Sequence, residues 1–196
     1  MIHFMAERLR RYREYRDEMK TGDVIACQGF DLGARIIRKV TKSLYSHVGL
    51  LVRFTEASVD RVFVLESLVE KGVLLWPLSR KLSDYNGKAW WLPLRLTGAR
   101  GTVTRQKKIR TRILRMAMEQ LGKQYDLKAI KYMATKYLLR NKRIPEESHH
   151  EFICSELVAY VFDRAALLPP DLKTSDLTPG DITALPCMGE PEEILT

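Results

Sequence analysis

Two apolar, β-branched runs joined by a short polar connection constrain the fold of this chain most. Residues 46–54 and 62–67 each have the length and composition of a strand, and their connection is short enough for a hairpin. One antiparallel register explains their side chains well, because it sets His47 against Glu66. The same register opposes other charged and apolar side chains, namely Arg53 with Asp60, Leu51 with Val62, and Leu50 with Phe63. We therefore expect a ladder that carries a histidine–glutamate pair.

A second constraint is the helical pattern that follows Cys154. Apolar residues recur there at helical spacing, at Ile153, Leu157, Val158, Val161, Phe162 and Ala165. Residues 141–150 before it are polar and include a proline, so Cys154 is expected in or beside the first helical turn. Unpaired backbone N–H groups and the helix dipole favour a thiolate at that place. A buried, inert cysteine is the alternative interpretation of Cys154 taken alone.

Shorter patterns add strands and helices around these two features. Strands are expected at 24–27, 71–76 and 89–94, and a Gly-Asp-aliphatic pattern at 180–182 predicts a late strand that returns to the same sheet. Helices are expected at 3–20, at about 31–42, at 103–121 with Gly122 as a stop, and at 127–140. Strands and helices mixed in this way predict an α+β fold.

The class of protein is limited by the length, the net charge and the number of cysteines. The 196 residues fit one domain, placed at residues 21–196, behind an N-terminal basic amphipathic helix at residues 1–20. We expect a cytoplasmic protein, because no apolar run reaches the length of a membrane span and no secretory signal is visible. The net charge of +9 predicts attraction to an anionic partner, and the basic faces of 3–20 and 104–143 could hold the protein against an anionic surface. Three cysteines are too few for a disulfide framework, and inert packing is favoured for Cys27 and Cys187.

His47, Glu66 and Cys154 are the residue types of a thiol nucleophile, its base and the acid that orients the base. Four short motifs carry a resemblance: Gly22-Asp23-Val24-Ile25, Ser46-His47-Val48-Gly49, Leu65-Glu66-Ser67, and Phe152-Ile153-Cys154-Ser155-Glu156-Leu157-Val158. In this order they resemble the circularly permuted papain-like hydrolases of the NlpC-type superfamily, specifically the YiiX/YebB-like branch, also called the YaeF/YiiX type. The resemblance spans about residues 21–185. It implies an α+β fold in which a small antiparallel barrel-like sheet packs on the nucleophile helix.

The resemblance also implies a chemistry, in which Cys154 is the nucleophile, His47 the base and Glu66 the orienting acid. An amide bond in a peptide, a cell-wall peptide or an N-acyl compound is the first choice of substrate, with an acyl-enzyme intermediate. A lipid ester or an acyl transfer is the second. Helix-start N–H groups at Cys154 and Ser155 would stabilise the oxyanion. Tyr125, in a Gly-x-x-Tyr-Asp element, could bind the oxyanion or line the cleft, or it could be a half-buried core residue.

Two other classes of function stay open. A catalytically silent adaptor of the same fold would bind an acidic or membrane partner through its basic surface, although the intact Cys–His–Glu set disfavours it. Nucleic-acid binding is permitted by charge, but no recognition motif is present and the aromatic residues are not interleaved with the basic runs. Four histidines without a Cys/His cluster at ligand spacing predict neither a metal site nor a cofactor.

Overall fold

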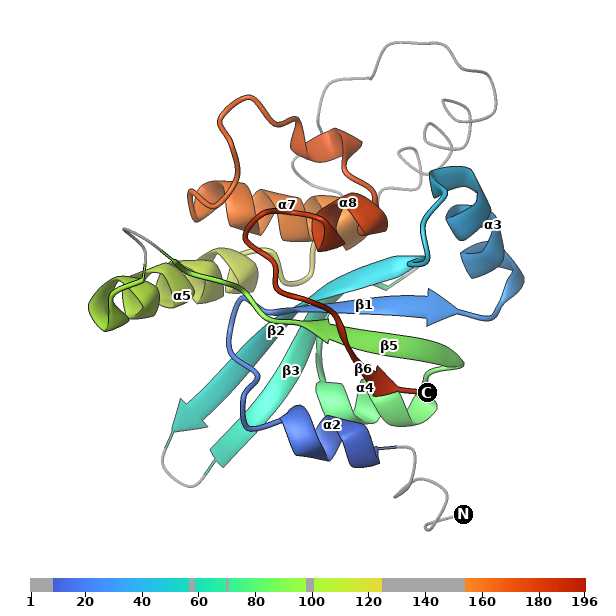
Figure 1. Ribbon diagram of the computed structural model, residues 1–196, viewed down its shortest axis with the longest axis horizontal. Coiled ribbons are helices and arrows are strands. Elements are labelled where there is room, and N and C mark those ends of the chain that lie inside the picture. The colour runs from blue at the N-terminus through green and yellow to red at the C-terminus, as the bar shows by residue number, and fades with distance from the viewer. Residues whose placement is uncertain (1–8, 57–58, 70, 98–100, 125–153) are drawn as a thin grey trace.

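The computed structural model describes residues 9–56, 59–69, 71–97, 101–124 and 154–196 (Figure 1). Its elements, in chain order, are α2 (Arg10–Tyr15), β1 (Val24–Gly29), α3 (Leu32–Thr41), β2 (His47–Glu56), β3 (Val59–Leu68), β4 (Gly72–Pro77), α4 (Leu78–Asp84), β5 (Gly87–Leu92), α5 (Val103–Met118), α7 (Cys154–Arg164), the 3-10 turn η2 (Thr174–Asp176), α8 (Pro179–Thr183) and β6 (Glu192–Leu195). The fold is therefore α+β, as expected. The predicted helix at 127–140 lies outside the described residues.

A six-stranded antiparallel sheet in the order β4-β3-β2-β1-β5-β6 forms the centre of the fold. The sheet is open, with β4 and β6 at its edges, whereas a barrel-like sheet was expected. Within the described chain each of these edge strands pairs with one neighbour only, so the sheet does not close. Side chains alternate across it: Val24 and Ala26 of β1 enter one core, and Ile25 and Cys27 enter the other.

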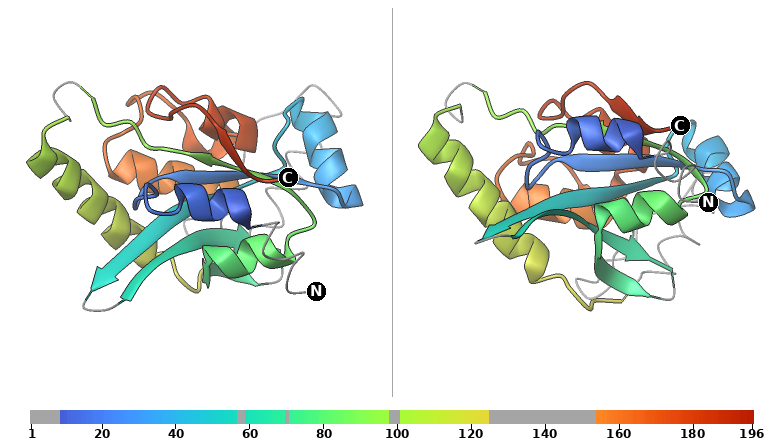
Figure 2. Two further views of the ribbon diagram at one scale, coloured as in Figure 1. Left: turned by 60° about the horizontal axis from the view of Figure 1, so that its bottom comes forward. Right: turned by 90° about the horizontal axis from the view of Figure 1, so that it is seen from below.

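Helices cover both faces of the sheet (Figure 2). On one face, the core takes in α7 and the inward side of α5, with Phe162 of α7 and Ile113 of α5 fully buried. On the other face, α2 and α4 supply Tyr12, Leu78 and Leu82 to the second core. Cys154, the candidate nucleophile on α7, therefore comes from a different layer of the protein than His47 and Glu66, which lie on strands.

The β2–β3 ladder forms, but the predicted register is wrong by two residues. Arg53 lies opposite Val62 rather than Asp60, and Leu51 lies opposite Val64. A displacement by two keeps every side chain on its expected face, because side chains along a strand alternate with a period of two. Arg53 still reaches Asp60 diagonally, with Nε 2.7 Å from Oδ1 and Nη2 2.6 Å from Oδ2. The charge pairing is therefore kept although the direct opposition is not.

The short helix α8 replaces the late strand that was predicted at 180–182. Thr178 and Asp181 form a capping box, in which the backbone N–H of Asp181 donates to Thr178 Oγ1 at 3.2 Å. The backbone N–H of Thr178 donates to Asp181 Oδ2 at 2.8 Å. Pro179 at the first helical position already has the backbone angle of a helix. The chain returns to the sheet later, as β6 beside β5.

The other predicted elements within the described residues are confirmed, with shifted ends. Strands 24–27, 71–76 and 89–94 correspond to β1, β4 and β5, and helices 31–42 and 103–121 to α3 and α5. Gly122 has a positive φ of +79°, but α5 already ends at Met118 with Glu119 as its C-cap, and the Gly122 N–H donates to the Val73 carbonyl oxygen, so Gly122 is not the residue that stops the helix. The N-terminal helix is described only as α2, and the domain boundary at residue 20 stays a prediction. No helix in the described part of the chain combines the length and the apolar character needed to span a bilayer.

Candidate active site

Strands β2 and β3 place an imidazole beside a carboxylate. His47 is the first residue of β2, and Glu66 lies near the end of β3. His47 Nε2 and Glu66 Oε2 are 2.7 Å apart, which is hydrogen-bonding distance. The Glu66 side chain is 1% exposed and that of His47 17%, so the pair is enclosed while part of the ring still meets solvent. Because Nε2 is engaged by Glu66, Nδ1 is the ring nitrogen left to exchange a proton with a third group.

A lysine that the sequence analysis did not single out holds the same carboxylate. Lys81 Nζ lies 2.9 Å from Glu66 Oε1 and 2.8 Å from Oε2. Lys81 projects from α4, a helix that the sequence analysis did not predict. A signal for this helix was present, because Leu78 and Leu82 are four residues apart and both are fully buried. Nothing in the sequence indicated that the helix would deliver its lysine to Glu66.

The charges of this cluster support one another. Burial alone would raise the pKa of Glu66, but the hydrogen bond and charge of His47, together with Lys81, lower this pKa to about 2. Burial alone would lower the pKa of His47, but the Cys154 thiolate and the Glu66 carboxylate raise it to about 9. At neutral pH the carboxylate is therefore ionised, and the imidazole keeps its proton while a thiolate is beside it.

Cys154 meets this pair from the opposite layer of the fold, as the first residue of α7. Burial tends to raise the pKa of its thiol. The charge and hydrogen bond of His47 outweigh burial, and the backbone N–H groups of Val48 and Ser155 add to their effect, so the pKa of Cys154 falls below its ordinary value. The thiolate is the reactive form of cysteine. Cys154, His47 and Glu66 are thus brought together, in the order of contact predicted from the sequence.

Cys27 shows what the same fold does to a thiol that lacks an imidazole partner. It lies directly opposite His47 in the β1–β2 ladder and is buried. Burial raises its pKa to about 12, with only partial relief from Lys81. Such a thiol is protonated and unreactive at neutral pH. Cys187 is also buried, and none of the three cysteines forms a disulfide.

The two residues expected to help bind an oxyanion have different outcomes. The backbone N–H of Ser155 hydrogen-bonds the Cys154 sulfur, so it lies at the reacting atom. The Ser155 hydroxyl is buried and has no hydrogen-bond partner among the described residues. Tyr125 lies outside the described residues, and so do His149 and His150, which precede the cysteine.

Fold and site together define an α+β protein with a buried Cys–His–Glu cluster at one end of an open antiparallel sheet. A solved structure with this fold is that of the metalloprotein YiiX from Escherichia coli O157:H7 (DUF1105), with a TM-score of 0.55 and 23% sequence identity. The match covers 76% of the present chain and 67% of YiiX. It confirms the YiiX-like fold that the sequence motifs predicted. No family model matches the chain, and no curated protein matches it either.

The description of YiiX as a metalloprotein raises the question of a metal site here. Across the described ranges, no group of three or more His, Cys, Asp or Glu side chains is arranged to hold a metal ion. His47 and Glu66 are already engaged with each other, and Glu66 also with Lys81. A cation such as Lys81 beside the carboxylate disfavours a second positive charge at the same oxygens. The described residues therefore do not fit a metal centre.

Proposed function

We propose that this protein is a thiol-dependent hydrolase of the permuted papain-like type, which cleaves an amide bond through an acyl-enzyme intermediate. The observation that carries the proposal is the cluster itself. Cys154 from α7 contacts His47, and His47 Nε2 lies 2.7 Å from Glu66 Oε2, although the three residues are far apart in the chain. The opposite pKa shifts of Cys154 and His47 favour a thiolate–imidazolium pair, which is the resting state of an activated cysteine.

The first half of the reaction uses this ion pair. The Cys154 thiolate attacks the carbonyl carbon, and the new C–S bond turns the carbonyl oxygen into an oxyanion. Backbone N–H groups at the start of α7, including that of Ser155, stabilise this charge. The His47 imidazolium then gives its proton to the leaving nitrogen as the C–N bond breaks, which leaves a thioester on Cys154 and a free amine.

The second half restores the enzyme. A water molecule takes the place of the amine. The neutral His47 removes a proton from this water as the water oxygen attacks the thioester. The C–S bond breaks, the carboxylic acid is released, and the thiolate reforms beside the imidazolium. Throughout, Glu66 stays ionised, fixes the ring through Nε2 and stabilises its positive charge.

Trapping the thioester tests the proposal directly. The protein is incubated with cell-wall peptides and with N-acyl dipeptides, quenched in acid, and the mass of each cysteine peptide is measured. We expect an acyl adduct on Cys154 and a loss of turnover on the order of 10³-fold or more for Cys154→Ser. Cys187→Ser is the matched control and is expected to keep full turnover. Wild-type turnover by the Cys154→Ser protein, with its fold intact by circular dichroism, would refute the assignment.

Alkylation separates this function from that of a silent adaptor. Iodoacetamide at neutral pH should label Cys154 faster than Cys27 and Cys187, because His47 lowers the pKa of Cys154, whereas burial raises the pKa of Cys27. Equal labelling of the three cysteines would favour an adaptor, which needs no activated thiol.

A further inference from the structure

The helix α3 is amphipathic, and its apolar side is only partly covered: Ile37 and Val40 are half-buried, whereas Leu32 and Ile36 are exposed. Ala34 is its buried residue, and the Ala34 Cβ lies 2.7 Å from the place that a Cβ on Gly29 would occupy. Arg38, one turn later on the same side, donates from Nη2 to the Gly29 carbonyl oxygen at 3.5 Å. Leu32 and Ile36 lie on another side of the helix and are 72% and 52% exposed.

Exposed apolar residues continue beyond both ends of this helix. Phe30 precedes α3 and Leu44 follows it, and each is about half exposed. We call Phe30, Leu32, Ile36 and Leu44 together the α3 face. Large apolar side chains that are exposed singly are ordinary, but four of them within the fifteen residues 30–44 favour an interaction surface.

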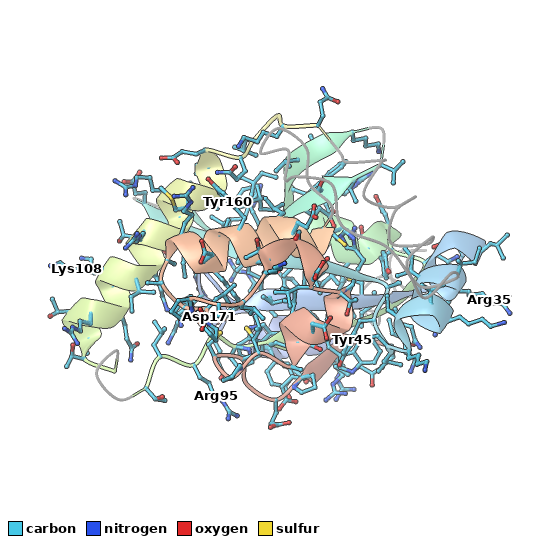
Figure 3. All side chains as sticks on the ribbon, turned by 90° about the horizontal axis from the view of Figure 1, so that it is seen from above. Arg35, Tyr45, Arg95, Lys108, Tyr160 and Asp171 are labelled. Atoms are coloured by element: carbon cyan, nitrogen blue, oxygen red, sulfur yellow. The ribbon has the colours of Figure 1, made fainter. Side chains whose placement is uncertain are left out.

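Positive charge borders the α3 face. Arg35 and Lys39 are exposed and one turn apart, beside the apolar stripe, and Lys42 is exposed just after the helix. Asp31 is the acidic residue of this segment, and its carboxylate accepts the backbone N–H of Ala34 as the helix cap. Figure 3 shows Arg35 projecting outward at the end of the molecule opposite Lys108 of α5. An apolar stripe edged by cations matches the interface of an anionic membrane, where apolar side chains enter and cations meet the headgroups.

We propose that the α3 face docks on anionic membranes. The sequence pattern had suggested residues 3–20 and 104–143 for such contact, but α2 in the first of these buries Tyr12 in the second core. Residues 42–46 connect α3 to His47, and α3 lies beyond the end of the sheet to which β1 runs (Figure 1). Docking through the α3 face therefore brings the Cys154–His47 end of the molecule close to the lipid surface.

Vesicle co-sedimentation tests the docking independently of any enzymatic activity. The full chain is mixed with phosphatidylcholine vesicles, with or without phosphatidylglycerol, and the bound fraction is measured. We expect binding to the anionic vesicles, and a loss of at least about tenfold in Leu32→Gln/Ile36→Gln, because two apolar side chains no longer enter the interface. Glutamine keeps the helix propensity of these positions.

Two matched controls separate the α3 face from general hydrophobicity and charge. Val59→Gln/Val103→Gln removes two other exposed apolar side chains, of which Val103 is 84% exposed, and should bind as the wild type does. Arg35→Glu/Lys39→Glu should weaken binding more than Lys107→Glu/Lys108→Glu, although both pairs change the net charge equally. The proposal fails if the wild type does not bind anionic vesicles, or if Leu32→Gln/Ile36→Gln binds as well as the wild type.

A second copy of the chain is the competing occupant of the α3 face. Sedimentation velocity without lipid would then show a dimer in the wild type and a monomer in Leu32→Gln/Ile36→Gln. That result, together with no vesicle binding, would overturn membrane docking and assign the surface to self-association.

Discussion

At the scale of single residues, Glu66 is the group on which the site depends. Its carboxylate is 1% exposed and accepts hydrogen bonds from two cations on different elements, His47 on β2 and Lys81 on α4. A buried carboxylate with no partner would take up a proton, and a neutral acid would neither orient an imidazolium nor stabilise its charge. Lys81 keeps Glu66 ionised even when His47 has given up its proton.

Replacing Lys81 should therefore affect both stability and its dependence on pH. Glu66 has a pKa of about 2 in the folded protein against 4.5 ordinarily, so its charge stabilises the fold above about pH 4.5. This stability is lost as the pH falls towards 2. In Lys81→Met the pKa of Glu66 rises and the carboxylate loses a buried partner, which should cost about 3 kcal/mol at neutral pH.

Urea unfolding at neutral and acidic pH measures this effect. The matched control is Lys88→Met, because Lys88 pairs with Glu193 at the surface, where ion pairs contribute about 0.5 kcal/mol. An unfolding free energy in Lys81→Met equal to that of the control at every pH would contradict the role given to Lys81.

The Cys154–His47 pair predicts a characteristic pH profile. The pKa of His47 is raised to about 9, so turnover should fall as the pH rises through about 9, where the imidazolium that protonates the leaving group disappears.

His47→Ala should reduce the alkylation rate of Cys154 at neutral pH by about 10²-fold, because the thiolate loses its counter-ion. The alkylation rates of the wild type and of His47→Ala are measured by stopping the reaction at intervals and analysing the peptide masses. An unchanged rate in His47→Ala would show that the imidazole does not activate the sulfur.

At the scale of elements, capping decides the structure of the segment that was expected to be a strand. In Thr178→Ala the Asp181 backbone N–H loses its acceptor, and α8 should be destabilised by about 1 kcal/mol. Thr178→Ser keeps the hydroxyl and should recover most of this loss. Chemical denaturation of the wild type and the two variants gives their free energies of unfolding. Equal stability of the alanine and serine variants would mean that the cap does not stabilise α8.

At the scale of the whole molecule, Arg53 joins the N-terminal segment to the sheet. Its Nη1 donates to the carbonyl oxygens of Arg16, Asp17 and Met19 at 3.0, 2.9 and 2.9 Å, while Nε and Nη2 hold Asp60 of β3. The segment after α2 is thus held against β2, and Met19 in this segment is fully buried. One planar group connects three parts of the fold.

Arg53→Lys tests whether this geometry, and not the charge, is needed. Lysine keeps the positive charge but cannot bind Asp60 and the carbonyl oxygens at once. We expect a loss of about 2 kcal/mol in unfolding free energy and faster amide hydrogen exchange in residues 10–20. Arg80→Lys, which alters an exposed pair with Asp84, serves as the control. Unchanged exchange in residues 10–20 would show that Arg53 does not hold the N-terminal segment.

The sequence by itself determined the features that depend on local periodicity and residue type. These are the strands β1 to β5, the helix that begins at Cys154, the face on which each hairpin side chain lies, and the choice of Cys154, His47 and Glu66. Only the tertiary structure decided the register of β2 against β3, the open sheet, the partnership of Lys81 with Glu66 and the exposure of Leu32 and Ile36 on α3. Periodicity repeats along a strand and so cannot tell one register from another two residues away. Contacts between distant elements depend on how whole layers pack, and no local pattern records them.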